Sequence, residues 1–135
     1  MNLILCLDDR NGISFNGRRQ SADRVVAKHI LDYVGQRRLW VRPKSQSFFP
    51  GAETHITVDP DCFRKAGLED FCFGEDETCL AYLLEARSII VYRWNRIYPA
   101  DVRFPEGELL RRRRLCAAEF SGSSHDRITQ EIYIL

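Results

Sequence analysis

The sequence has few lysines, almost no net charge and no long apolar run. Its 20 basic and 19 acidic residues leave a formal net charge of +1, which gives no long-range attraction for a polyanion. No apolar stretch approaches the roughly 20 residues of a membrane span. The segment from Asn2 to Leu7 is too short for a signal peptide and lacks a basic flank. We therefore expect a soluble cytoplasmic protein with no membrane partner.

The sequence also lacks the spacing of a metal site. Its five cysteines are an odd number without a CxxC pair. Zinc sites need four ligands at close paired spacing, and His29, His55 and His125 are each isolated from those cysteines. Free cysteine behaves as a small apolar residue. The sequence therefore predicts reduced, mostly buried thiols and gives no support for a metal.

What is present is a globular composition of 44% hydrophobic and 29% charged residues. No repeat or low-complexity linker divides the chain, so residues 1–135 are expected to form a single domain. Short apolar runs alternate with helical patterns and end in two strands around a wide loop. This order predicts an α/β fold: a central, mostly parallel sheet with flanking helices and a C-terminal antiparallel β-hairpin.

Particular segments carry this prediction. Asn2–Leu7 and Ile89–Trp94 are apolar on both faces, as expected of central strands. Ser21 can cap a helix that ends at Gly35, with Asp23 in its first turn. Further strands are expected at residues 39–41, 56–58, 71–73, 115–120 and 128–134. A short helix or a turn is expected at 44–49, one or two helical turns at 60–66, and a helix opening at Asp76 or Thr78.

Arginine supplies 17 of the 20 basic residues. Its planar guanidinium matches carboxylates and phosphates, although pairing with the acidic residues is the simpler role. The only run is Arg111–Arg114, at the start of a predicted strand. Alternating side chains would put two of these arginines on each face, so a continuous basic stripe is not guaranteed.

The order of several local strings resembles dihydrofolate reductase. That family opens with an apolar strand, a loop with a Gly-Ile step and a helix bearing an early acidic residue. The matching strings here are Leu3–Leu7, Gly12-Ile13, Ala22-Asp23, Phe71–Asp76, Tyr82-Leu83, Ile89–Trp94 and Asp101–Pro105, followed by the C-terminal hairpin. The resemblance covers most of the chain, with a shortfall between about Thr57 and Glu69 in the region that would contact the cofactor's adenosine.

The resemblance implies roles for individual residues. Asp23 matches the acidic residue that orients the pterin, and Tyr92 matches a strand position that hydrogen-bonds near it. The family's tryptophan in the first loop is replaced by the polar string Arg18-Arg19-Gln20-Ser21. A flat apolar ring would lose a packing partner there, whereas an anionic ligand would gain two guanidinium groups. We therefore expect a changed, anionic ligand.

The cofactor side departs further from the family. Its glycines let backbone amides approach a pyrophosphate, but here Gly74 is followed by Glu75, Asp76 and Glu77. One like-charge contact at about 4 Å costs on the order of 4 kcal/mol at an effective dielectric of about 20. The segment before Phe71 is also short. The sequence therefore argues against NADPH, and no cofactor is expected.

The first loop and the last hairpin loop meet in the resembled family, so their polar residues are expected to cluster. The predicted cluster contains Asp8, Asp9, Arg10, Asn11, Arg18, Arg19, Gln20, Ser123, Ser124 and His125. Asp9 and Asp23 are candidate general acids or bases, and His125 could serve as a base for Ser124, although no third orienting group is evident. The alternative is a hydrogen-bonded brace between two loops.

Several functions remain open at this point. The strings Asp8–Gly12, Arg18–Ser21 and Gly122–His125 also resemble a group of short bacterial proteins, some labelled ribonuclease Z. The sequence lacks the HxHxDH string that this enzyme needs. We expect a small polar or anionic ligand in the former pterin cleft, with catalysis left open. The alternatives are an RNA or nucleotide-binding module, a working reductase, and an interaction role.

Overall fold

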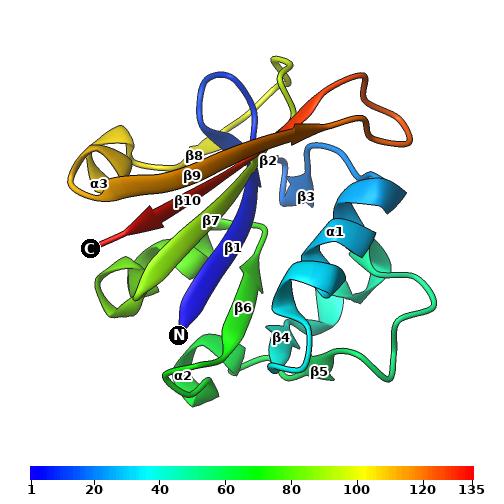
Figure 1. Cartoon of the computed structure of the whole chain (residues 1–135), viewed down its shortest axis with the longest axis vertical. Coiled ribbons are helices and arrows are strands. Elements are labelled where there is room, and N and C mark those ends of the chain that lie inside the picture. The colour runs from blue at the N-terminus through cyan, green and yellow to red at the C-terminus, as the bar shows by residue number, and fades with distance from the viewer.

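The computed structural model describes residues 1–135 as a large twisted sheet covered on both faces (Figure 1). The order of its seven strands is β5-β4-β6-β1-β7-β10-β9, and β3-β2-β8 form a small second sheet. The strands are β1 Asn2–Leu7, β2 Gly12–Phe15, β3 Arg18–Arg19, β4 Leu39–Val41, β5 Thr57–Val58, β6 Phe71–Gly74, β7 Ser88–Arg93, β8 Val102–Arg103, β9 Arg113–Phe120 and β10 Ile128–Ile134. This architecture confirms the predicted fold class.

The centre of the sheet is β1, which pairs in parallel with β6 and with β7. Its side chains alternate between two separate cores. Leu3, Leu5 and Leu7 enter one core, and Ile4 enters the other. A strand covered on both faces must be apolar at consecutive positions, and this is the pattern that predicted it.

One core lies under α1 (Arg24–Val34) and the 3-10 helix η1 (Pro43–Phe48). The other lies under α2 (Cys62–Lys65), the 3-10 helix η2 (Glu77–Glu85) and α3 (Glu106–Leu110). Three of the five cysteines are fully buried, namely Cys62, Cys72 and Cys79, and all five are free thiols. No helix is long and apolar enough to cross a membrane.

The start of α1 differs from the prediction. Asp23, and not Ser21, is the N-cap, and its side chain accepts hydrogen bonds from the N–H groups of Val25 and Val26. The extended backbone at Asp23 places the carboxylate over these two donors, which have no partner inside the helix. Gly35 ends the helix as predicted, at a left-handed φ of 61°.

The sequence prediction missed the second sheet and α3. The turn between β2 and β3 contains Asn16 and Gly17, both with positive φ. An Asn-Gly pair is a strong local signal for a tight hairpin, so β2 and β3 could have been predicted. The region between Thr57 and Glu69 forms only the short β5 and the single-turn α2.

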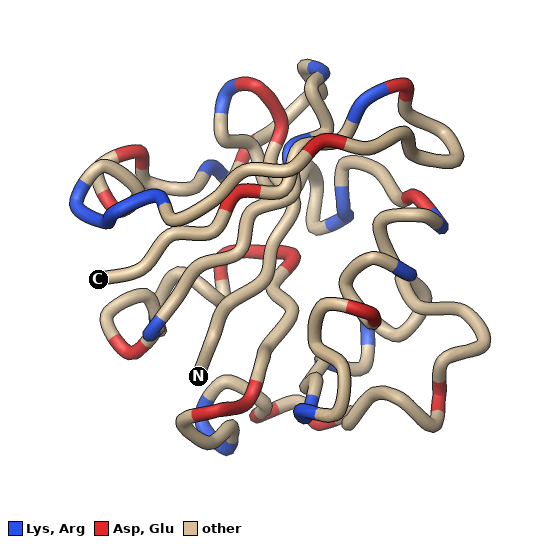
Figure 2. Tube along the Cα trace, viewed as in Figure 1, with Lys and Arg blue, Asp and Glu red and all other residues tan.

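The arginine run, Arg111–Arg114, connects α3 to the start of β9 (Figure 2), and its members have different partners. Arg112 is buried, and its Nη2 donates to the carbonyl oxygens of Leu83 and Ala86 at 3.1 and 2.9 Å. Arg111 pairs with Glu108 of the acidic α3. The run therefore holds η2 and α3 against the sheet instead of presenting four guanidinium groups to solvent.

A substitution of Gly74, at the end of β6, tests the packing under η2. A Cβ added there would lie 2.7 Å from Cys79 Cβ, so Gly74→Ala should lower the free energy of unfolding by about 1 to 3 kcal/mol. Gly107→Ala in α3 is the matched control, because its Cβ would meet nothing and the helix favours alanine by up to about 1 kcal/mol. Urea denaturation measures both, and equal stabilities would contradict this packing.

Candidate functional site

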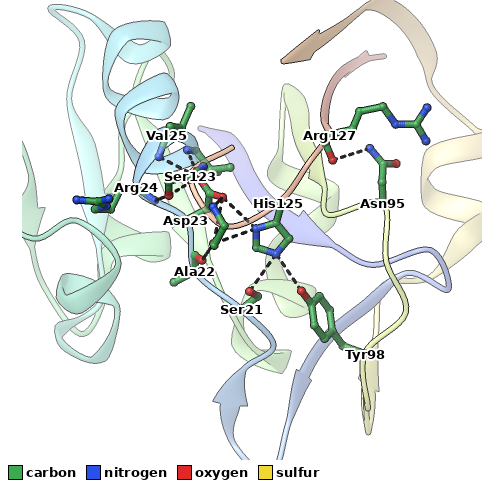
Figure 3. Close-up of polar contacts among 12 residues, drawn as sticks. Ser21, Ala22, Asp23, Arg24, Val25, Asn95, Tyr98, Ser123, His125 and Arg127 are labelled. Carbon is green, nitrogen blue, oxygen red and sulfur yellow. Dashed lines mark hydrogen bonds and ion pairs between the residues drawn. The ribbon is translucent and has the colours of Figure 1, made fainter. Parts of the chain in front are cut away.

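The carboxylate of Asp23 is the most heavily hydrogen-bonded group where the first loop meets the last one (Figure 3). Besides capping α1, it accepts the backbone N–H groups of Ser123 and Ser124, each at 2.9 Å. The hydroxyl groups of both serines also lie within 3.2 Å of it. The side chain is fully buried, so every lone pair faces a protein donor. Asp23 is therefore not available to contact a ligand directly.

The remaining partner of Asp23 is His125. His125 Nδ1 lies 2.9 Å from Asp23 Oδ2, and its side chain is only 2% exposed. On the other side of the ring, Nε2 lies 3.1 Å from the hydroxyl of Ser21 and 2.9 Å from that of Tyr98. Trp94 stacks on the ring with centroids 4.5 Å apart. The imidazole is thus held from three sides.

Burial and hydrogen bonding act in opposite directions on Asp23. Burial alone would raise its pKa, but the hydrogen bonds from Ser123, Ser124, His125 and Val26 outweigh this and hold the pKa well below the usual range. Asp23 therefore stays ionised at neutral pH. A charged carboxylate beside the ring also favours a proton on His125 Nδ1.

Asp8, at the end of β1, forms a second buried node. Its carboxylate accepts the N–H groups of Arg10, Gly12 and Tyr98, and the side-chain amide of Gln20 at 3.0 Å. Burial would raise the pKa of Asp8, and these hydrogen bonds instead bring it below its ordinary value. Gln20 is therefore engaged by Asp8. Because Tyr98 contacts both nodes, it joins Asp8 to His125.

Next to this node lies a narrow space that we call the closed cleft. It is walled by Cys6, Ile13, Phe48, Phe73 and Trp94, and it contains only about 10 Å³ of free volume. Arg19 and Glu75 close it with a bidentate ion pair, in which Arg19 Nη2 lies 3.0 Å from Glu75 Oε1. A water needs about 10 to 15 Å³ by the same measure, so this interior has space for at most about one water and none for an aromatic ring.

Two open hollows flank the mouth of the closed cleft, and both are lined by Arg18 and Arg19. The larger hollow, of about 580 Å³, also includes Phe15, Gln20 and Tyr98. The smaller, of about 320 Å³, also includes Lys44 and Glu75. Arg18 is exposed and its guanidinium has no hydrogen-bond partner in the protein, whereas Arg19 binds Glu75 and the Ser47 hydroxyl.

The acidic turn after β6 is neutralised by basic residues. Asp76 pairs with Arg42 at 2.9 Å and with Lys44 at 2.5 Å, and it caps η2 through Thr78 N–H. These basic residues therefore largely offset the repulsion that Glu75 and Asp76 were expected to exert on a pyrophosphate. The same pairing means that the cations nearest this turn already bind carboxylates.

The other predicted site residues lie apart from Asp23. Asp9 and Asn11 line a separate hollow of about 440 Å³ beside Arg93 and Glu131, and the exposed Arg10 lies between them in the chain. Tyr92 is buried on the α1 face, where its hydroxyl contacts His29 and Gln130. Burial raises its pKa. The structure thus places Asp9, Asn11 and Tyr92 away from the residues around Asp23, whereas Tyr98 and Gln20 connect Asp8 to His125 and to the arginine-lined hollow.

The sequence prediction missed two partners of His125. It assigned Ser21 to the helix cap, and it did not single out Tyr98 at all. Ser21 is 104 residues from His125 and Tyr98 is 27 residues from it, so no local spacing indicates either contact. It also stated that the His125 pair lacked an orienting group, which Asp23 supplies.

Comparison with known proteins supports the fold. No family model and no curated protein matches the sequence. Among solved structures, the chain is similar to a dihydrofolate reductase from Enterococcus faecalis complexed with NADP(H) and RAB-propyl. The TM-score is 0.66 and the identity 12%, over 98% of this chain and 94% of that one. This likeness shows a dihydrofolate reductase-like fold, and the resemblance to the bacterial group labelled ribonuclease Z stays a prediction.

Replacing Asp23 should weaken the fold in a pH-dependent way. Its pKa is lower in the folded state, so its stabilisation is present above the ordinary aspartate pKa of about 4 and is lost as pH falls below it. Asp23→Asn should lower the free energy of unfolding by about 2 to 4 kcal/mol at neutral pH. The difference from the parent protein should shrink in acid.

The control for this measurement is Asp126→Asn, an exposed aspartate of the same loop. It should match the parent protein at every pH. Urea denaturation at a series of pH values measures all three proteins. An Asp23→Asn variant with the parent's full loss of stability in acid would contradict the assigned role of Asp23.

Proposed function

We propose that this protein binds a small anionic ligand at the mouth of the closed cleft and does not act as an NADPH-dependent reductase. The observation that carries the proposal is the contrast between the filled cleft and its open, arginine-lined mouth. The interior has about 10 Å³ of free volume, whereas the two hollows that share Arg18 and Arg19 have about 580 and 320 Å³.

The walls of the closed cleft support the exclusion of a flat ring. Phe48, Phe73 and Trp94 are each at least 97% buried, so no apolar slot is left between them. Opening it would require breaking the Arg19–Glu75 pair, in which Glu75 is only 8% exposed. Removing one partner of such a pair leaves a buried charge uncompensated, at a cost of about 3 to 5 kcal/mol.

The arginine pair supports an anionic ligand. Arg18 has no partner in the protein, so its guanidinium is free to form a bidentate contact with a carboxylate or a phosphate. Arg19 is held in place by Glu75, which pairs with its charge, and it lines both hollows beside Arg18. Arg18 therefore supplies the unpaired positive charge that an anionic ligand would contact.

The residues at the acidic turn do not fit a dinucleotide. Arg42 and Lys44 bind Asp76, and Arg19 binds Glu75, so the three cations nearest the turn after β6 are already paired. Gly74 also lies against Cys79, which leaves little room for a ligand to approach the backbone. A dinucleotide would have to displace two nearly buried carboxylates from their partners.

The arrangement of Arg111–Arg114 favours the small ligand over the nucleic-acid alternative. Arg112 is buried, Arg111 pairs with Glu108, and Arg114 lies 3.6 Å from Glu131. Only Arg113 has no partner. Nucleic-acid affinity depends on several phosphate contacts, and this segment presents one free guanidinium.

Calorimetric titration with inorganic pyrophosphate at low ionic strength tests the proposal. We expect saturable binding that Arg18→Ala weakens at least about tenfold, because a charge-assisted hydrogen bond contributes about 1.5 to 3 kcal/mol. Arg113→Ala removes the same charge from β9 and should keep the parent affinity within about twofold. NADPH should show no saturable binding at millimolar concentration.

Two results would overturn this function. Equal pyrophosphate affinity in the parent and the Arg18→Ala variant would remove the role of the arginine pair. Micromolar NADPH binding would mean that the turn after β6 accepts the dinucleotide. A short single-stranded RNA is titrated in parallel, and binding that is lost in Arg113→Ala but kept in Arg18→Ala would favour the nucleic-acid alternative.

A further inference from the structure

We infer that Ser21 is an activated nucleophile that accepts an acyl group from an ester, with His125 as its base and Asp23 as the residue that positions His125. The three side chains form one chain of hydrogen bonds (Figure 3). Ser21 Oγ lies 3.1 Å from His125 Nε2, and His125 Nδ1 lies 2.9 Å from Asp23 Oδ2. A nucleophile, a base and an orienting carboxylate in this order define nucleophilic catalysis by geometry, whatever the fold.

The direction of the hydrogen bonds follows from Asp23. Its ionised carboxylate can only accept, so His125 donates from Nδ1. In neutral imidazole the other nitrogen, Nε2, then carries a lone pair. That lone pair faces the hydroxyl groups of Ser21 and Tyr98, and either hydroxyl can donate to it. The base is therefore in the tautomer that can remove the Ser21 proton.

The site is held rigidly around an accessible serine. Asp23 and His125 are almost fully buried, and Trp94 stacks on the imidazole ring. Gly122 passes so close to Asp23 that an added Cβ would lie 2.9 Å from the carboxylate carbon. Ser21, in contrast, is only partly buried, and it lies in the wall of the closed cleft beside Gln20. Gln20 and Tyr98 also line the 580 Å³ hollow, so a reagent in that hollow contacts the chain neighbour of Ser21 and the tyrosine that shares its histidine.

The backbone around Ser21 supplies possible donors for a developing oxyanion. The N–H groups of Ser21 and Ala22 take part in none of the hydrogen bonds of the fold. Unpaired N–H groups next to a nucleophile can stabilise the negative charge that forms on a carbonyl oxygen during attack. The first turn after β3 thus contains both the nucleophile and these donors.

An ester would react at Ser21 in two steps, acylation of the serine and hydrolysis of the acyl ester. Ser21 Oγ bonds to the acyl carbon while its proton passes to His125 Nε2, and the bond to the leaving alcohol breaks. The alcohol takes the proton from His125, which leaves an acyl ester on Ser21. Water then attacks that ester with His125 again as base, releases the carboxylic acid and restores the serine.

The class of substrate rests on the proposed function. Because Arg18 and Arg19 line the hollow that reaches Tyr98, an acyl group with its own carboxylate should react faster than an uncharged one. The activation of Ser21 does not depend on this preference. The two claims therefore have separate tests.

The Tyr98 hydroxyl limits the hydrogen bond between Ser21 and His125. This hydroxyl lies 2.9 Å from His125 Nε2, closer than that of Ser21, so the two donors compete for one lone pair. Removing the tyrosine hydroxyl leaves Ser21 as the only donor. If the network were only structural, removing the tyrosine hydroxyl would lower stability and would not speed the reaction of Ser21.

The experiment treats the full-length protein with p-nitrophenyl acetate, follows p-nitrophenolate release and locates the acyl group by mass spectrometry after an acid quench. We expect acylation on the peptide that contains Ser21, and no such acylation in Ser21→Ala. Asp23→Asn should react at least about a thousandfold more slowly, because the wrong histidine tautomer is then stabilised. Circular dichroism confirms that each variant is folded.

Two further variants keep the test decisive if Asp23→Asn unfolds. Tyr98→Phe should acylate Ser21 at least as fast as the parent protein. Ser121→Ala, which removes an exposed serine of the last loop, should react at the parent rate. Acylation confined to lysines or to other serines, or a Tyr98→Phe variant more than about tenfold slower, would overturn the inference.

The acyl preference is measured with mono-p-nitrophenyl succinate beside the acetate. The succinate ester should react at least about tenfold faster, and Arg18→Ala should remove that advantage. If Ser21 is acylated equally by both esters, the inference holds and the anion-binding function fails. If pyrophosphate binds through Arg18 but Ser21 is not acylated, the function holds and the inference fails.

Discussion

The burial of one ionised carboxylate, Asp23, is the constraint on which the loop arrangement depends. A charge out of water must be surrounded by donors, and these come from α1, from Ser123 and Ser124, and from His125. Segments about 100 residues apart are thereby held together. The same carboxylate caps a helix, fixes a loop and orients an imidazole, so structure and chemistry cannot be separated at this residue.

A second constraint is the filled cleft. Aromatic side chains from η1, β6 and the end of β7 occupy the space where the fold could leave a slot, and the Arg19–Glu75 pair closes it. The fold is similar to that of dihydrofolate reductase, and the closed cleft of this chain contains only about 10 Å³ of free volume. Charge pairing also changes the meaning of the acidic turn, because Asp76 is bound by Arg42 and Lys44. The polar groups that stay accessible lie at the mouth, around Arg18, Tyr98 and Ser21.

Local patterns were enough for much of the fold. Continuous apolar runs identified β1 and β7 as central strands, and Gly35 marked the end of α1. The resemblance carried by ordered strings identified the architecture, which the solved structure confirms at 12% identity. Asn16-Gly17 carried a hairpin signal that the sequence prediction overlooked. The strands, the helix end and the hairpin turn depend on neighbours within a few residues, and the order of the strings is itself a property of the sequence, which is why the sequence alone determines them.

The tertiary structure decided which polar residues meet. The sequence indicated that Asp23 and His125 are functional candidates, but it could not show that Asp23 faces the imidazole or that Ser21 and Tyr98 face its other nitrogen. It also could not show that Arg112 is buried while Arg18 stays free. Hydrophobic periodicity is a local property of the sequence, whereas the partner of a charged side chain depends on the packing of distant segments. The class of fold and several candidate residues therefore came from the sequence by itself, and the contacts between those residues came only from the folded chain.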